Sequence, residues 1–158
     1  MTELEYDLVC KDMKYLIDSV WLACAIDGEG TISLQVNHYT PEISVTGTNF
    51  AFVEKAAKIM ETKVSVVKRQ FTEKYRIGNR EPDRWAICYS ARQRSMSKIK
   101  ALLERVLPFL IIKACHAKLM IEFCELRENK TYCEVFGRSP REDEIFLKLK
   151  ELNRKGVK

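Results

Sequence analysis

The fold of this chain is decided by the stretch Trp21-Leu22-Ala23-Cys24-Ala25-Ile26-Asp27-Gly28-Glu29-Gly30-Thr31-Ile32. Small and apolar residues recur at helical spacing up to Gly28, and the alternation of a strand begins directly after Gly30. The helix therefore ends on a carboxylate, Glu29. The last carbonyls of a helix carry the negative end of its dipole, so an acid there is unfavourable unless a hard cation lies beside it. The stretch predicts a helix-to-strand corner that presents an acid to a divalent metal, although a glycine after a helix is also an ordinary helix stop.

One face of the same helix carries small residues at the spacing of helical neighbours. Its members are Val20, Ala23, Cys24, Asp27 and Gly28. A face of such small side chains lets a second helix approach backbone to backbone. We therefore expect this face to contact another helix.

Length and composition limit the class of protein. The chain has 158 residues, of which 46% are hydrophobic and 31% charged, as in a globular domain. That length suits one domain with its own core, or a small domain completed by dimerisation. Apolar runs stay short of transmembrane length, and the acidic start is unlike a signal peptide. We expect an intracellular protein, in the cytoplasm or an organelle, without membrane contact.

The six cysteines lack the paired spacing of zinc sites and disulfide frameworks. They sit among apolar residues, which predicts buried free thiols.

The net charge of +5 is unevenly spread. Residues 63–94 hold nine lysines and arginines against only three acidic residues. A basic segment of this kind is typical of proteins that bind a polyanion such as a nucleic acid, although charge runs are often solvated surface.

Periodicity predicts helix, two strands, helix, two strands and then helices. The expected helices cover 13–27, 49–60, from 95 to an interruption at Pro108, from about 112, and from Ser139-Pro140 to Gly156. The expected strands cover 31–39, 42–46, 64–71 and 84–89. Residues 1–11 are predicted to form a short helix or a loose arm.

Residues 22–30 resemble the signature of the LAGLIDADG homing endonucleases, and they match it at Leu22, Ala23, Ile26, Asp27 and Gly30. Cys24 stands where the family usually has glycine, and Ala25 where it has a larger apolar residue. The resemblance implies an α+β fold of the αββαββα type, with a curved antiparallel sheet and helices on one of its faces. It implies one domain over 1–158, with its core at about 12–128 and a helical C-terminal extension at about 129–158.

Because the signature occurs once, the resemblance implies a homodimer in which two signature helices pack at the twofold axis. The interface would comprise Val20, Ala23, Cys24, Asp27 and Gly28. Glu29 of each subunit would bind divalent metal, Mg²⁺ or Mn²⁺, with the carbonyl of Gly28 as a further ligand. Asp27 is expected to be structural rather than a metal ligand.

Further catalytic residues come from the same resemblance. The segment from Leu107 to Lys113 resembles the family segment that ends in an active-site lysine, which assigns that role to Lys113. The family often has a polar residue after the second strand that orients the attacking water. Gly47 stands at or beside that position here, so the expected alternatives are Thr48, Asn49 or water alone.

The polar faces of the four strands are expected to contact DNA, because a sheet of this kind lies in the major groove and offers donors and acceptors to base edges. The candidates for base contacts are Ser33, Gln35, Asn37, Tyr39, Ser44, Thr46, Lys68, Gln70 and Arg84. Candidates for phosphate contacts are Arg69, Lys74, Arg76 and Arg80.

Together with these features, the resemblance implies an intron-encoded, metal-dependent homing endonuclease that cuts both strands of a long, nearly palindromic site and leaves short 3′ overhangs. Two alternatives stay open. The first is a maturase that binds the RNA of its own intron, and the second is a DNA-binding regulator that does not cleave. Glu29 and Lys113 weigh against the maturase, although the resemblance implies that enzymes of this family sometimes do both jobs. Metal-dependent nicking of DNA would exclude the regulator.

Overall fold

The computed structural model describes residues 3–36, 38–70, 85–129 and 139–154. Its elements follow one another as α1 (Glu3–Glu29), β1 (Gly30–Leu34), β2 (Pro41–Gly47), α2 (Phe50–Ile59), β3 (Val64–Gln70), β4 (Trp85–Gln93), α3 (Met96–Val106), the short 3₁₀ helix η2 (Leu107–Phe109), α4 (Ala114–Glu128) and α5 (Pro140–Leu152). This order confirms the α+β arrangement that the periodicity predicts.

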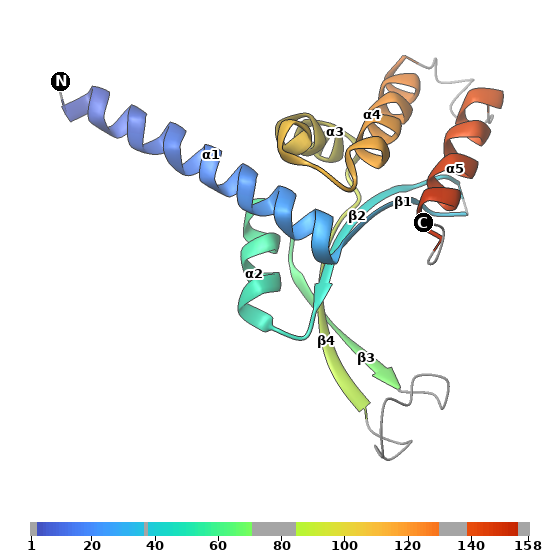
Figure 1. Cartoon of the computed structure of the whole chain (residues 1–158), viewed down its shortest axis with the longest axis horizontal. Helices are drawn as coiled ribbons and strands as arrows, with labels where there is room; N and C mark the ends of the chain where they lie inside the picture. The colour runs from blue at the N-terminus through green and yellow to red at the C-terminus, as the bar shows by residue number, and fades with distance from the viewer. Residues whose placement is uncertain (1–2, 37, 71–84, 130–138, 155–158) are drawn as a thin grey trace.

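The described strands form one antiparallel sheet in the order β1-β2-β4-β3. Ile32 pairs with Ile43 across β1 and β2, and Val45 pairs with Ala91 across β2 and β4. All four side chains are fully buried, because strand alternation directs them to the face that the helices cover. The sheet is curved, and α1 to α4 lie on its convex side (Figure 1).

The hydrophobic core joins the C-terminal half of α1 to the sheet and to the later helices. Leu22 and Ile26 of α1 are fully buried in the same cluster as Leu103 of α3 and Phe123 of α4. Burying one side chain of this size contributes about 1.5–3 kcal/mol. The core therefore fixes the end of α1 that carries Glu29.

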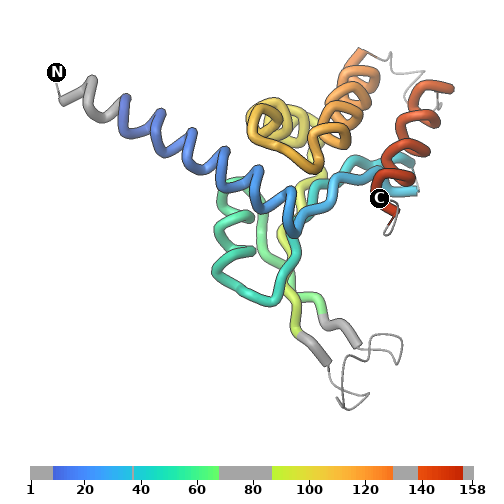
Figure 2. The backbone as a smooth tube through the Cα atoms, in the orientation of Figure 1, coloured from blue at the N-terminus to red at the C-terminus, as the bar shows by residue number. Residues whose placement is uncertain are grey.

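The other half of α1 has no such support. The helix begins at Glu3 rather than near Met13, and every residue from Val9 to Ile17 is exposed. Figure 2 shows this part of α1 projecting away from the body of the molecule. The predicted short helix or loose arm is thus a continuous extension of the signature helix.

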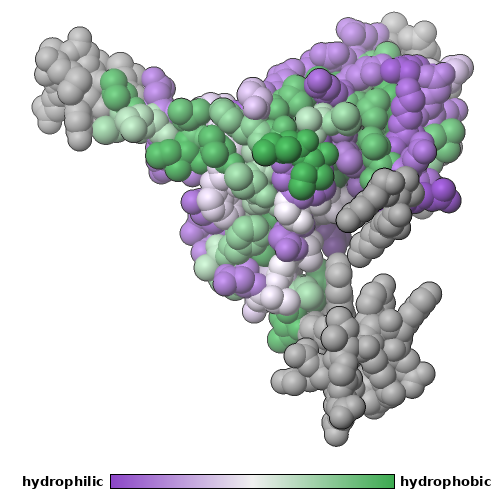
Figure 3. All heavy atoms as spheres, viewed as in Figure 1, coloured by the Kyte–Doolittle hydropathy of each residue, from purple (hydrophilic) through white to green (hydrophobic). Residues whose placement is uncertain are grey.

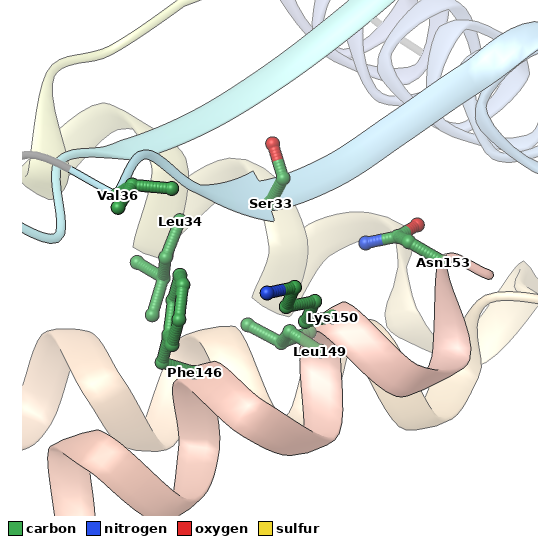
Figure 4. A pocket seen from close by; sticks show the side chains of 7 residues that line it. All are labelled: Ser33, Leu34, Val36, Phe146, Leu149, Lys150 and Asn153. Carbon is green, nitrogen blue, oxygen red and sulfur yellow. The ribbon is translucent and has the colours of Figure 1, made fainter.

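The C-terminal helix α5 closes the far end of the molecule. Its first turn has a capping box, in which the Ser139 hydroxyl accepts the N–H of Glu142 and the Glu142 carboxylate accepts the N–H of Ser139. The same carboxylate is fully buried and forms an ion pair with Arg127 of α4. Figure 4 shows Phe146 and Leu149 of α5 facing β1 across a cavity of about 300 Å³.

The prediction that the first strand extends to Tyr39 is wrong. The strand β1 ends at Leu34, and His38 and Tyr39 have φ angles of 70° and 50° in the turn that follows. The Tyr39 ring is buried and stacks on Phe146 with centroids 4.6 Å apart, while its hydroxyl donates to Asp143 at 2.6 Å. This left-handed turn brings Tyr39 to α5, so Tyr39 cannot serve as the predicted DNA contact.

The described cysteines are free thiols, but burial is predicted correctly only for Cys124. Burial raises the pKa of that thiol to about 12. Cys10, Cys24 and Cys115 are exposed, the first two because they lie on the outer face of α1.

Among the described residues, no helix has the length and apolar character needed to cross a membrane.

Candidate functional site

The corner between α1 and β1 presents Glu29 to solvent. The helix ends at Glu29, the strand begins at Gly30, and the Glu29 side chain is exposed. A Cβ atom at Gly30 would lie 2.6 Å from the Cα of Ile26, so only glycine permits this close return of the chain. A Cβ at Gly28 would meet no atom within 4 Å. The turn therefore requires a glycine at 30, whereas nothing in the chain's own packing requires one at 28.

Asp27 binds the segment that precedes α4. Its Oδ2 accepts the N–H of Ile111 at 2.7 Å and that of Ile112 at 3.2 Å, and its Oδ1 accepts the N–H of Lys113 at 2.8 Å. Burial alone raises the pKa of this carboxyl, but the three backbone donors and the charge of Lys113 outweigh it and leave the pKa below its usual value. Both oxygens are thus engaged within the chain, which agrees with the expected structural role.

Lys113 in turn contacts the end of α1. Its Nζ donates to the carbonyl oxygens of Ile26 at 2.7 Å and of Asp27 at 2.6 Å, two of the acceptors left unpaired at a helix C-terminus. Burial lowers the pKa of Lys113, against the opposing effect of the Asp27 and Glu29 carboxylates. The fold therefore brings a partly buried ammonium beside the predicted metal-binding acid, although the two residues lie far apart in the sequence.

Thr48 and Asn49 follow the end of β2. Thr48 is exposed, and the Asn49 side chain caps α2 by accepting the N–H of Phe52 at 3.1 Å. Asn49 therefore already has a structural function, which leaves Thr48 as the freer of the two candidates for orienting water.

The face of the sheet opposite the core carries a row of polar residues. Strand pairing aligns Thr31 with Ser44 and Ser44 with Arg92, and the neighbouring pair is Thr46 and Ser90. The hydroxyls of Thr46 and Ser90 lie 3.1 Å apart, and Arg92 Nε donates to the Ser90 hydroxyl at 3.1 Å. The predicted contacts Ser44 and Thr46 are thus partly exposed on the same face as the exposed Arg92, whereas Ser90 on that face is fully buried.

Arg92 is missing from the sequence-based set of DNA contacts. The fourth strand is predicted to end at Tyr89, but it continues to Gln93. The alternation of polar Ser90 and Arg92 with Ala91 was the available signal.

The other predicted DNA contacts divide into two groups. Ser33 lies in β1, Gln35 is exposed just beyond it, and Lys68, Arg69 and Gln70 end β3. The second group falls outside the described residues and consists of Asn37, Lys74, Arg76, Arg80 and Arg84.

The small-residue face of α1 is only partly available to a partner. Val20 is 40% exposed, and Cys24 and Gly28 are exposed. Ala23 is fully buried in the chain's own core, so its assignment to a dimer interface is wrong. The reason is geometric, since Ala23 lies about 60° around the helix from Val20, toward Ile26 and the core.

Within the described part of the chain, the corner offers two candidate oxygen ligands for a divalent cation, from Glu29 and Gly28. The described residues contain no cluster of three or more His, Cys, Asp or Glu side chains. The Glu29 carboxylate and a Gly28 carbonyl beside it are hard oxygen donors of the kind that Mg²⁺ prefers. The octahedral coordination of that ion needs more ligands than these two residues supply. The residues fit a metal as one part of a site that other molecules complete.

Comparison with solved structures identifies the fold. The homing endonuclease I-CvuI, in complex with its target in the presence of calcium, matches with a TM-score of 0.58 over 92% of this chain and 87% of that chain, at 18% identity. I-CvuI in complex with the I-CreI target in the presence of magnesium, with the DNA not cleaved, matches with a TM-score of 0.57 over 92% and 88%, at 16% identity. This chain has the homing-endonuclease fold.

No protein-family model and no curated protein matches the chain by sequence. The homing-endonuclease fold is therefore established by structure, and the resemblance of residues 22–30 to the LAGLIDADG signature agrees with it. Within this fold, the signature ends at the corner that brings Glu29 and Lys113 together.

Proposed function

We propose that the chain is a homodimeric, site-specific homing endonuclease that hydrolyses one phosphodiester in each strand of double-stranded DNA. The observation that carries this proposal is the convergence of Glu29 and Lys113 at one corner, where Lys113 Nζ caps α1 at 2.6 and 2.7 Å. A lysine with a purely structural role would account for the cap on α1 alone. The exposed Glu29 carboxylate beside this cap adds a group that can bind a divalent metal for phosphodiester hydrolysis.

Each residue has a distinct part in this chemistry. The Glu29 carboxylate, with the Gly28 carbonyl, would hold Mg²⁺ or Mn²⁺, and such an ion supplies an activated water and neutralises charge on the phosphate. Lys113 has a third N–H beyond the two that the α1 carbonyls accept, and it directs this donor and its charge to the phosphate oxygens. Asp27 keeps Lys113 in place through the backbone of residues 111–113.

A second copy completes the site. Each chain supplies one Glu29, whereas two DNA strands must be cut. An isologous dimer therefore places one such corner at each of the two scissile phosphates. The exposed Cys24 and Gly28 allow the two α1 helices to approach. A twofold dimer reads a nearly palindromic target, which the polar face with Ser44, Thr46 and Arg92 contacts in the major groove.

The test is cleavage of DNA that carries the uninterrupted insertion locus of the gene. The unmodified protein is expected to cut both strands with Mg²⁺ and not with EDTA, and Glu29→Gln is expected to bind this DNA without cutting it. Glu54→Gln is the matched control, because Glu54 lies on the surface of α2 paired with Lys58, and it should cleave normally.

Two outcomes would favour the alternatives. Tight binding of the DNA without cleavage by the unmodified protein indicates a regulator, and preferential binding of the intron RNA indicates a maturase.

A further inference from the structure

The projecting half of α1 exposes an apolar stripe that the chain itself does not cover. Val9, Met13, Leu16, Ile17 and Val20 are between 40% and 59% exposed. Their spacing of three or four residues puts them on one face of the helix. Figure 3 shows hydrophobic residues along this projecting helix and over the adjoining connection between α3 and α4.

The projecting half of α1 continues a helix of 27 residues, but the apolar stripe on it gains no packing from the chain. Most helical stability in proteins comes from packing of an apolar face. From Val9 to Ile17 every residue is exposed, and the contact that the chain makes here is the Arg105 guanidinium over the Tyr15 ring at 4.6 Å, off the stripe. The apolar residues of the stripe therefore indicate that another molecule packs on them.

The stripe is continuous with the corner that carries Glu29. Asp27 lies two helical turns beyond Val20 on the same face, and it holds the backbone of residues 111–113. Ile111 and Ile112 are 87% and 69% exposed beside it. One apolar surface therefore runs from Val9 along α1 to the isoleucines at the site.

The size of this surface fits a large part of a dimer interface. It comprises seven apolar residues that are each 40–87% exposed, namely Val9, Met13, Leu16, Ile17, Val20, Ile111 and Ile112. Each partner in a stable complex contributes ~800 Å² of surface. Exposed apolar patches on monomers rarely exceed a few hundred Å².

We propose that the projecting half of α1 forms a parallel two-helix seam with the same segment of a second copy, which extends the subunit interface beyond the signature. This proposal rests on the homodimer of the proposed function, in which two Glu29 side chains meet at one twofold axis. Two helices that meet at their C-terminal ends around that axis run in the same direction. Met13 and Leu16 then each lie near their own counterpart, in the a and d positions of a heptad whose next a position is Val20. The heptad ends at Val20, because its next d position, Ala23, is buried in the chain's own core.

Cysteine crosslinking tests the direction and register of the seam. The exposed thiols Cys10, Cys24 and Cys115 are first replaced by serine. Met13→Cys is then compared with Lys11→Cys, which lies on the opposite side of the same exposed turns. Under mild oxidation without DNA, Met13→Cys is expected to form a disulfide-linked dimer and Lys11→Cys is not. Equal crosslinking of the two variants would overturn the proposal.

Sedimentation equilibrium tests the contribution to affinity. Leu16→Asp is expected to weaken dimerisation by about 100-fold or more, since the twofold axis counts each buried leucine twice. Leu147→Asp is the matched control, because Leu147 is 61% exposed on α5, and it should leave the dimer unchanged. Helix content by circular dichroism verifies that both variants fold.

The outcomes separate this proposal from the proposed function. Normal dimerisation and cleavage by Leu16→Asp would refute the seam and leave the endonuclease intact. A dimer that Leu16→Asp weakens, in a protein that does not cut DNA, would support the seam and refute the endonuclease. An unmodified protein that stays monomeric at ~100 μM, far above the Kd of a specific complex, would refute the seam.

Discussion

Replacing Asp27 with asparagine is expected to loosen the segment that carries Lys113. The substitution preserves shape but converts one carboxylate oxygen into an amide NH₂. Whichever oxygen is replaced, a donor then faces a backbone donor, either that of Lys113 or those of Ile111 and Ile112. The remaining amide oxygen still accepts a hydrogen bond, but it does so without a full negative charge.

The size of the effect follows from these three hydrogen bonds. A hydrogen bond to a charged group contributes about 1.5–3 kcal/mol, and an unsatisfied partner adds a desolvation penalty when it is buried. The bonds at Ile111 and Ile112 lie at the surface, where water replaces the lost acceptor. We therefore expect Asp27→Asn to lower the free energy of unfolding by about 2 kcal/mol rather than by the full sum.

The pH dependence identifies the cause. The folded pKa of Asp27 lies below its usual value of 3.8, so the carboxylate stabilises the folded state above that pH. Its contribution is lost as the pH falls from 3.8 toward the folded pKa. The difference in stability between the unmodified protein and Asp27→Asn should therefore be constant near neutral pH and shrink below about pH 4.

Urea unfolding at one fixed protein concentration, followed by circular dichroism, measures this difference, because dimerisation makes apparent stability concentration-dependent. Asp12→Asn, at an exposed position of the same helix, is the control and should change stability by less than about 0.5 kcal/mol. An Asp27→Asn protein as stable as this control at pH 7 would refute the structural role assigned to the carboxylate. So would a difference between the two proteins that is independent of pH.

Three further substitutions test other parts of the structure. Lys113→Met should reduce the single-turnover cleavage rate with Mg²⁺ by about 100-fold or more while changing DNA affinity little; an unchanged rate would make the lysine a helix cap only. Tyr39→Phe removes the bond to Asp143 and should lower the free energy of unfolding in urea by about 1 kcal/mol without affecting DNA affinity. Arg92→Ala should weaken DNA binding, measured by fluorescence anisotropy, and reduce the slope of log affinity against log salt by about 1 if the side chain contacts a phosphate.

The order of helices and strands was accessible to sequence reasoning because strong local patterns specify it. The glycine at position 30 and the alternation of Ile32 with polar neighbours fix the helix-to-strand corner, and Ser139-Pro140 fixes the start of α5. Each of these signals acts over a few residues. The end of α1, the start of β1 and the start of α5 are accordingly found within about two residues of their predicted positions.

The errors arise where a distant segment decides the outcome. Tyr39 continues an alternating pattern, but its ring packs against α5, which lies more than a hundred residues later in the sequence. Ala23 belongs to a stripe of small residues, yet it is fully buried in the hydrophobic core that α1 forms with the sheet and the later helices. Similarly, the bonds between Asp27 and residues 111–113 have no signature in either segment alone.

The link between Asp27 and Lys113 also has a consequence for the order of events during synthesis. The two residues are 86 positions apart, so the contact closes a long loop and belongs to the slow, non-local class of folding steps. While the chain is being synthesised from its N-terminus, Glu29 is made early but its lysine arrives only with α4. A nascent chain would therefore carry Glu29 without Lys113, and the corner would be assembled only after most of the protein had left the ribosome.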